Sequence, residues 1–165
     1  MALTTAQLQT LKAAIAAETN PAFVEYRTNG DNGMMAAFYN EASNPAFIVW
    51  RTSVSQDEIT QNGFDWVRVD NLSVGKARIW EWMFANATRV FNPSKANVRA
   101  GIDEAWKGPA ADLAVRAAVY VHCKRAAKRG EALYTTGTGT DAVPGVLVFE
   151  GSISPSDITA ARNLE

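Results

Sequence analysis

The sequence predicts a mainly α protein: a compact helical domain of about five to seven helices over residues 1–134, followed by an extended C-terminal arm over residues 135–165. Three observations lead to this fold class. Apolar residues recur at spacings of three and four through most of the first 134 positions, and capping residues precede these stretches. The clearest strand pattern lies at 146–149, after a linker rich in threonine and glycine. The arm is therefore expected to hold one β-strand and a short terminal helix.

The expected helices are set by their capping and stop signals. Thr4 or Thr5 caps the first helix, which ends before Asn20-Pro21 because proline disfavours helix at the preceding residue. The others follow in order: a short helix ending near Tyr39, a helix capped by Ser53 or Ser55 through Ile59 and stopped at Asn62-Gly63, a helix over 74–87 with Val74 on its buried stripe and Trp82 off it, a helix from Asn92-Pro93 through Ala105, a long helix over 113–129, and a last helix capped by Ser154.

Two nine-residue stretches, 20–28 and 44–52, match at six positions. The match is consistent with an internal duplication. The interpretation we favour is two similar aromatic segments that each follow a turn-forming Asn-Pro pair. The similarity does not extend beyond nine residues, so a repeat architecture of three or more stacked units is excluded.

The arm carries the predicted partner-binding residues. The strand is apolar at nearly every position, and a helical domain has no sheet of its own to receive it. We therefore expect it to pair with another chain by β-augmentation, with a local hairpin across Pro144-Gly145 as the alternative. A chain ending at Tyr134 is then expected to stay folded. The predicted partner-binding residues are Val146, Leu147, Val148, Phe149, Ile153 and Ile158.

Composition excludes several classes of site. One cysteine and one histidine exclude an internal disulfide and any zinc site that needs several Cys or His ligands. Gly137-Thr-Gly139 lacks the lysine of a phosphate loop, and His122-Cys123 are helix neighbours that point about 100° apart. No run of about 18 uncharged apolar residues is present, so no membrane span is expected. We predict no enzymatic activity, no cofactor and no metal.

Charge is segregated along the chain, although the net charge is only −1. Residues 1–60 carry a net −3, residues 61–129 a net +6 and residues 130–165 a net −4. The basic segment ends in a predicted basic face at the end of the long helix, formed by Lys124, Arg125, Lys128 and Arg129. This face is expected to meet an acidic protein segment or to contact DNA passively through its phosphates.

Three strings are similar to a family of small virion proteins of tailed bacteriophages: residues 71–84, 92–102 and 136–141. The resemblance covers about residues 45–162. It implies a virion protein made in the cytoplasm of a host bacterium. By analogy of architecture we expect a head-to-tail adaptor, a neck component that forms a homo-oligomeric ring and contacts portal and tail proteins. The alternatives are a tail-terminator or head-decoration protein, or a small cytoplasmic nucleic-acid-binding protein.

Overall fold

The computed structural model describes residues 2–61 and 64–165. These residues form ten helices and three two-stranded sheets and are 52% helical, which makes the fold mixed α/β. The prediction of a mainly α fold with five to seven helices and one strand is therefore wrong. The missed strands are two or three residues long, too short to show the alternation that identifies a strand in a sequence. The expected helix stop at Asn62-Gly63 lies outside the described residues.

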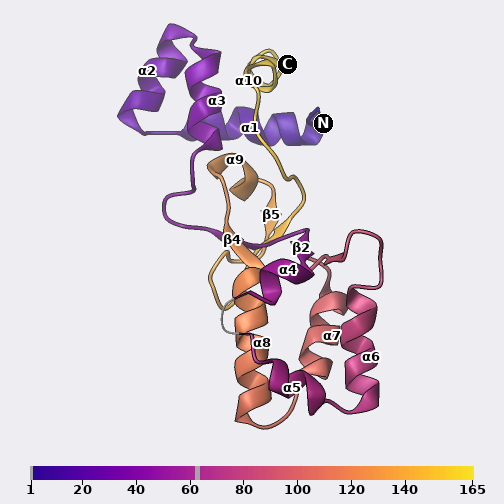
Figure 1. The fold of residues 1–165 in the computed structure, drawn as a ribbon. Helices are drawn as coiled ribbons and strands as arrows, with labels where there is room; N and C mark the ends of the chain where they lie inside the picture. The colour runs from indigo at the N-terminus through magenta and orange to yellow at the C-terminus, as the bar shows by residue number, and fades with distance from the viewer. Residues whose placement is uncertain (1, 62–63) are drawn as a thin grey trace. The chain divides into compact units, whose positions relative to one another are not determined.

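The chain divides into two compact units (Figure 1). Unit 1 combines Met1–Val49 with Ala126–Glu165, and unit 2 is the continuous segment Trp50–Arg125 between them. The sequence suggested a division at residue 134, but the chain passes between the units after Val49 and after Arg125. Residues 135–165 belong to unit 1 because they contribute apolar side chains to its core, whereas the inserted segment has a core of its own.

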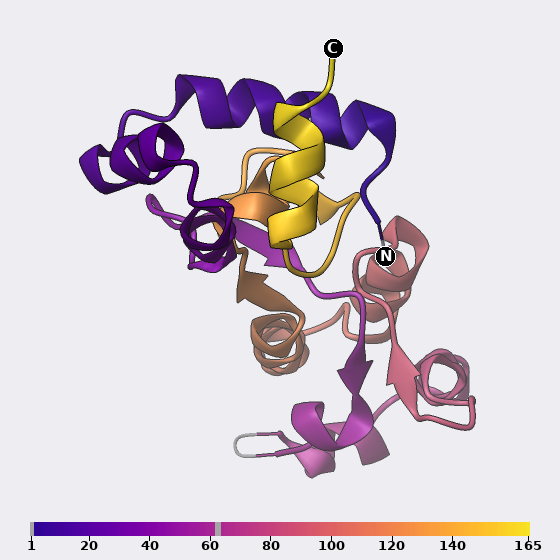
Figure 2. The same cartoon turned by 90° about the horizontal axis from the view of Figure 1, so that it is seen from above.

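Unit 1 is built from short helices and one small sheet. The Thr4 side chain accepts a hydrogen bond from the Gln7 backbone N–H and caps the first helix, as predicted. The last helix packs against the first, and Figure 2 shows it crossing the first helix. In chain order the elements are α1 (Thr5–Ala17), α2 (Pro21–Asn29), α3 (Asn32–Asn40), α9 (Arg129–Ala132), β5 (Thr135–Thr136), β6 (Val146–Leu147) and α10 (Pro155–Arg162).

The arm residues complete the core of unit 1. Phe149, Ile153 and Ile158 are buried there, and the Phe149 ring lies 5.5 Å from the Tyr134 ring. The Asn40 side chain fixes the arm to α3, because its amide donates to the Ile153 carbonyl and accepts from the Ile153 N–H, each at 2.8 Å. This arrangement corrects the expectation that the arm extends away from its own domain.

The loop between β5 and β6 is also held in place, although its composition suggested a flexible linker. Gly139 has a positive φ of 67°, and a Cβ there would lie 2.4 Å from the Phe47 ring. Only glycine suits this close approach and this backbone conformation. The Gly139 carbonyl accepts from the Ile48 N–H at 2.7 Å, and the Gly145 N–H donates to the Ile48 carbonyl at 2.8 Å.

The two similar stretches adopt different structures. Asn20 caps helix α2, which begins at Pro21, whereas residues 44–52 contain strand β1 (Ile48–Trp50). Strand β1 pairs with β4 (Lys124–Ala126), where the chain passes between the two units. Tertiary pairing therefore decides the structure of the second stretch, since the aromatic pattern itself suits either.

Unit 2 packs its helices around a core rich in aromatic residues. Trp80 and Trp106 have ring centroids 5.3 Å apart in an edge-to-face contact, and helices α6 and α7 lie side by side (Figure 1). In chain order the elements are β2 (Val54–Ser55), α4 (Gln56–Ile59), α5 (Trp66–Asp70), α6 (Val74–Met83), β3 (Val90–Phe91), α7 (Ala96–Ala105) and α8 (Ala110–His122), with β2 antiparallel to β3.

Three helices are shorter than predicted, and the first of them, α6, ends at Met83 instead of near residue 87. Helix α7 begins at Ala96, after a turn in which the Asn92 side chain accepts from the Ser94 N–H and hydroxyl. Helix α8 ends at His122 because the chain then continues as strand β4. The Cys123 carbonyl accepts from the Arg51 N–H, and the Ala127 N–H donates to the Phe47 carbonyl. Pairing with β1 thus replaces the expected helix after His122.

Candidate interaction surfaces

The four residues of the predicted basic face do not lie on one helix. Lys124 and Arg125 are in strand β4 and belong to unit 2, whereas Lys128 and Arg129 begin α9 in unit 1. The Lys128 ammonium donates to the Gly151 carbonyl and the Ser152 hydroxyl, so it anchors the arm within its own unit. The DNA contact inferred from a common helical face therefore loses its structural basis.

The predicted partner-binding residues of the arm are likewise used inside the chain. Val146 and Leu147 form β6, which pairs with Thr136 and Thr135 of β5. Val148 alone of the six is highly exposed; Phe149, Ile153 and Ile158 are buried. The strand pairs within its own unit, as the local-hairpin alternative predicted in part. Its partners Thr136 and Thr135 lie ten and twelve residues upstream, however, and not directly across Pro144-Gly145.

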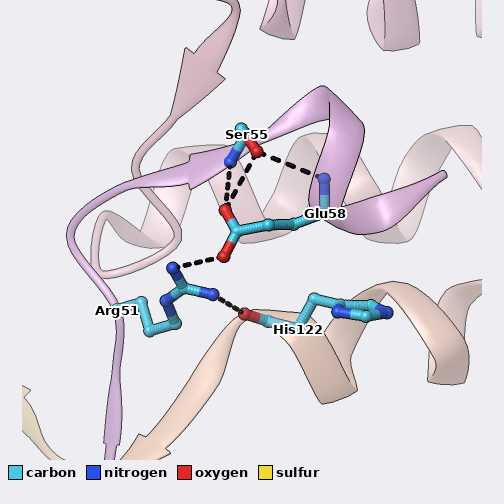
Figure 3. A network of polar contacts seen from close by, with 4 residues as sticks. All are labelled: Arg51, Ser55, Glu58 and His122. Atoms are coloured by element: carbon cyan, nitrogen blue, oxygen red, sulfur yellow. Dashed lines mark hydrogen bonds and ion pairs between the residues drawn. The ribbon is translucent and has the colours of Figure 1, made fainter. Parts of the chain in front are cut away.

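A polar network fixes helix α4 to the end of α8 within unit 2 (Figure 3). Arg51 forms a 2.7 Å ion pair with Glu58 and donates to the His122 carbonyl at 3.1 Å. Glu58 also accepts from the Ser55 N–H and hydroxyl, which completes the predicted capping box. The hydrogen bond from the Ser55 backbone, followed by that from Arg51, lowers the pKa of Glu58. The network therefore holds helix α4 against the end of α8, and the Arg51, Ser55 and Glu58 side chains are engaged in these contacts.

The His122-Cys123 pair is not arranged for nucleophilic chemistry. In Figure 3 the His122 imidazole is turned away from the network, which it joins only through its main-chain carbonyl. Cys123 is buried, and burial raises the pKa of its thiol to about 12, so the thiol is protonated at neutral pH. Across residues 2–61 and 64–165, no cluster of three His, Cys, Asp or Glu side chains is placed to hold a metal ion.

The Arg51–Glu58 ion pair gives a pH-dependent prediction. Glu58→Gln keeps a hydrogen-bonding group beside Ser55 and removes the charge. A carboxyl whose pKa is lowered by folding stabilises the fold above its ordinary pKa of 4.5 and loses this effect as the pH falls through its folded pKa. Because the side chain is partly exposed, the variant is expected to lose about 0.5–1 kcal/mol at pH 7.

Urea unfolding of both proteins between pH 3 and pH 8 tests this expectation. The difference in unfolding free energy should be constant above pH 6 and should close below pH 4.5. Glu81→Gln is the control, since Glu81 is exposed and forms no ion pair with any described residue. A difference that persists at pH 3 would contradict the assignment to the Glu58 charge.

Two highly exposed apolar side chains of unit 2 lie on α6. Trp82 is 77% exposed and Val74 is 71% exposed, and Arg78 stands between them at the i, i+4 spacing of one helical stripe. We call Val74, Arg78 and Trp82 the α6 face. Trp82 lies off the buried stripe, as the sequence suggested, whereas Val74 had been assigned to the buried side. The α6 face lies within residues 71–84.

Unit 1 contains two hollows on its surface. The larger, about 350 Å³, is lined by residues of α1, α3 and α9, among them Tyr39 and Arg129. The Tyr39 hydroxyl and the Arg129 Nε are both buried without a hydrogen-bond partner, and burial raises the pKa of Tyr39. The smaller, about 190 Å³, lies between α2 and α3, and we call it the α2–α3 hollow. Its lining mixes apolar residues with the polar side chains of Asn20, Glu41 and Arg129.

The two units carry opposite net charges. Unit 1 has five Lys and Arg against nine Asp and Glu, a net −4, and unit 2 has eleven against eight, a net +3. The segregation seen along the sequence is thus largely a difference between two folded units. The division of charge between two folded units could not be predicted from the sequence. Residues 113–129 were expected to form one helix, whereas the chain passes from unit 2 to unit 1 after Arg125.

Comparisons of the chain with protein-family models, with curated proteins and with solved structures gave no match. Within the described part of the chain, none of the helices is both long and apolar enough to cross a bilayer.

Proposed function

We propose that this protein is a structural component of a tailed-phage virion, a head-to-tail adaptor that assembles into a homo-oligomeric ring in the neck. The observation that carries the proposal is the α6 face: an exposed tryptophan and valine on one helical stripe, inside a string similar to phage virion proteins. Large exposed apolar side chains on one helix face of a soluble protein are typical of interaction sites, and Trp82 and Val74 lie two turns apart on this face with Arg78 between them.

The charge difference between the units supports self-assembly. A contact between the basic unit of one copy and the acidic unit of the next joins two different surfaces. Such heterologous contacts generate closed rings when the rotation between copies closes. The arm does not support ring assembly, because its residues Phe149, Ile153 and Ile158 are buried in unit 1.

The proposal predicts that the protein is present in purified particles of a phage that encodes it. Mass spectrometry of the particles should detect the chain in several copies for each portal ring, and gold-labelled antibody should mark the neck in electron micrographs. Label along the tail tip or over the head surface would instead support a tail-terminator or decoration protein. Absence from the particles, together with salt-sensitive DNA binding by a soluble monomer, would contradict a virion role.

A further inference from the structure

The larger hollow of unit 1 is lined by buried polar groups that no other side chain or backbone group satisfies. Among the described residues, three side-chain polar atoms are buried without a hydrogen-bond partner, and two of them, on Tyr39 and Arg129, belong to residues that line this hollow. A buried donor without a partner is destabilising, so such atoms are uncommon in folded proteins. Two of them beside one hollow indicate that a bound group supplies the missing acceptor.

The Arg129 guanidinium is fixed by packing and keeps its hydrogen-bond donors available. It lies over the Phe38 ring, 4.0 Å from the ring centroid, and the Arg129 backbone N–H donates to the Glu41 carbonyl. The side chain donates no hydrogen bond to any described residue, and its 3.6 Å ion pair with Glu41 is longer than a hydrogen bond. The planar guanidinium matches a carboxylate, which accepts two parallel N–H bonds from it.

The Tyr39 hydroxyl is the second donor at the hollow. Tyr39 is only 3% exposed, and edge-to-face contacts with the Phe23 and Phe38 rings fix its position. Burial raises the pKa of Tyr39, and the nearby Glu18 carboxylate raises it further, so the hydroxyl is protonated at neutral pH. A carboxylate that accepts from this hydroxyl therefore meets the like charge of Glu18, unless the ligand carries an ammonium beside its carboxylate.

The composition of the lining fits such a zwitterion. Glu18 and Arg129 are the one acid and the one base among the described residues that line the hollow, so its formal charge is zero. Glu18 Oε1 accepts from the Thr19 and Asn20 N–H groups, whereas its Oε2 has no hydrogen bond with a described residue. Three alanines, Phe38 and Leu133 supply apolar surface. The volume, about 350 Å³, is at the lower end of the range for small-molecule sites and suits a compact ligand.

We propose that the larger hollow of unit 1 binds a free α-amino acid with an aliphatic side chain. The ligand carboxylate accepts from the Arg129 guanidinium and the Tyr39 hydroxyl, and its ammonium donates to the Glu18 carboxylate. The aliphatic side chain packs on the alanines and Leu133. All of these groups belong to unit 1, and the site is independent of the proposed virion role.

Titration of the full chain with L-leucine, followed by calorimetry and amide NMR, tests the site. Backbone signals of Ala14, Ala17 and Leu133 should shift, whereas the tryptophan indole signals, which all come from unit 2, should not. Leucinamide lacks the carboxylate and N-acetyl-leucine lacks the ammonium, so each should bind about tenfold more weakly. N-acetyl-leucine that binds as tightly as leucine, or leucine that is displaced by inorganic phosphate, would overturn the assignment to an amino acid.

Substitutions in the lining separate binding from folding. Arg129→Lys should weaken leucine binding about tenfold, because an ammonium cannot donate the two parallel bonds. Glu18→Gln should weaken it to a similar extent, and the matched control Glu25→Gln, at an exposed acid of α2 outside the lining, should have little effect. Tyr39→Phe should weaken binding about fivefold without lowering the melting temperature of the free protein, because the lost hydroxyl has no partner there.

Three outcomes would contradict the proposal. Glycine, valine and leucine that all fail to bind the wild-type chain at millimolar concentration would overturn the site. Unchanged binding in folded Arg129→Lys and Glu18→Gln variants, checked by circular dichroism, would place any bound leucine elsewhere. A fall in the melting temperature of free Tyr39→Phe would show that the hydroxyl is paired within the protein and is not a donor for the ligand.

Discussion

Ile158→Asp is expected to unfold unit 1 and to leave unit 2 folded. Ile158 is fully buried in the core of unit 1, where α10 packs on α1 and α3. Losing a buried isoleucine costs about 2–5 kcal/mol, and an unpaired carboxylate in the same place adds several more. A typical domain is stabilised by about 5–15 kcal/mol in all, and one small unit holds only part of that. The combined loss is therefore enough to unfold unit 1.

The distribution of aromatic residues allows the two units to be followed separately. All five tryptophans lie in unit 2, so tryptophan emission reports on that unit alone. In Ile158→Asp the helical circular dichroism signal should fall while the emission maximum stays that of the wild type. Val148→Asp, at an exposed position of the same arm, is the control and should keep both signals.

The same logic applies to a chain ending at Tyr134. The sequence suggested that this truncation stays folded, whereas the structure leads to the opposite expectation, because Phe149, Ile153 and Ile158 leave the core together. Full retention of the helical signal in the truncated chain, or in Ile158→Asp, would show that the arm is dispensable for unit 1. A simultaneous shift of tryptophan emission would show that the two units unfold as one.

Local signals in the sequence predicted local structure well. Thr4, Ser55 and Ser154 were candidate cap residues in the sequence, and each caps a helix with reciprocal hydrogen bonds. These caps depend on residues three positions apart, so a single sequence contains the whole interaction. The short helix ending near Tyr39 is confirmed for the same reason, with Asp31 as its cap.

Structure that depends on distant pairing was not predictable in the same way. Residues 124–126 continue a helical pattern of spacing, yet they form strand β4. They do so because they pair with β1, which lies more than 70 residues upstream. Because the expected helix ends at His122, the four residues of the predicted basic face do not share one helical face. The arm was expected to bind another chain because no strand that could pair with its apolar strand was recognised in the sequence. The pairing strand is β5 in the same unit, which consists of two threonines and therefore has no apolar pattern.

The candidate interaction surface was found only in part. Trp82 could be separated from the buried stripe by helical spacing alone, and its exposure agrees with that prediction. The larger hollow of unit 1 could not be found, because it depends on how α1, α3 and α9 pack and on Arg129 approaching Phe38 from the far end of the chain. A surface formed by packing between helices cannot be predicted from the residue spacing within one helix.

Trp106→Ala is expected to produce the largest loss of stability in unit 2. Trp106 is fully buried after the end of α7 and contacts Trp80 and Phe64 edge-to-face. Removing a buried tryptophan costs about 3–5 kcal/mol, since the cavity left behind collapses only in part. Urea unfolding followed by tryptophan emission measures the effect, because the four remaining tryptophans all report on this unit.

Trp106→Phe separates packing from polarity at the same position. The indole N–H of Trp106 is buried without a hydrogen-bond partner, and an unsatisfied buried donor costs about 1–3 kcal/mol. Phenylalanine removes that donor and retains much of the ring packing, so its loss should be well below that of Trp106→Ala. Trp82→Ala, measured at concentrations where the protein is monomeric, should change the unfolding free energy by less than about 0.5 kcal/mol. A loss for Trp106→Phe as large as for Trp106→Ala would mean that the N–H is paired in solution, because only then does its removal add to the cost of the cavity.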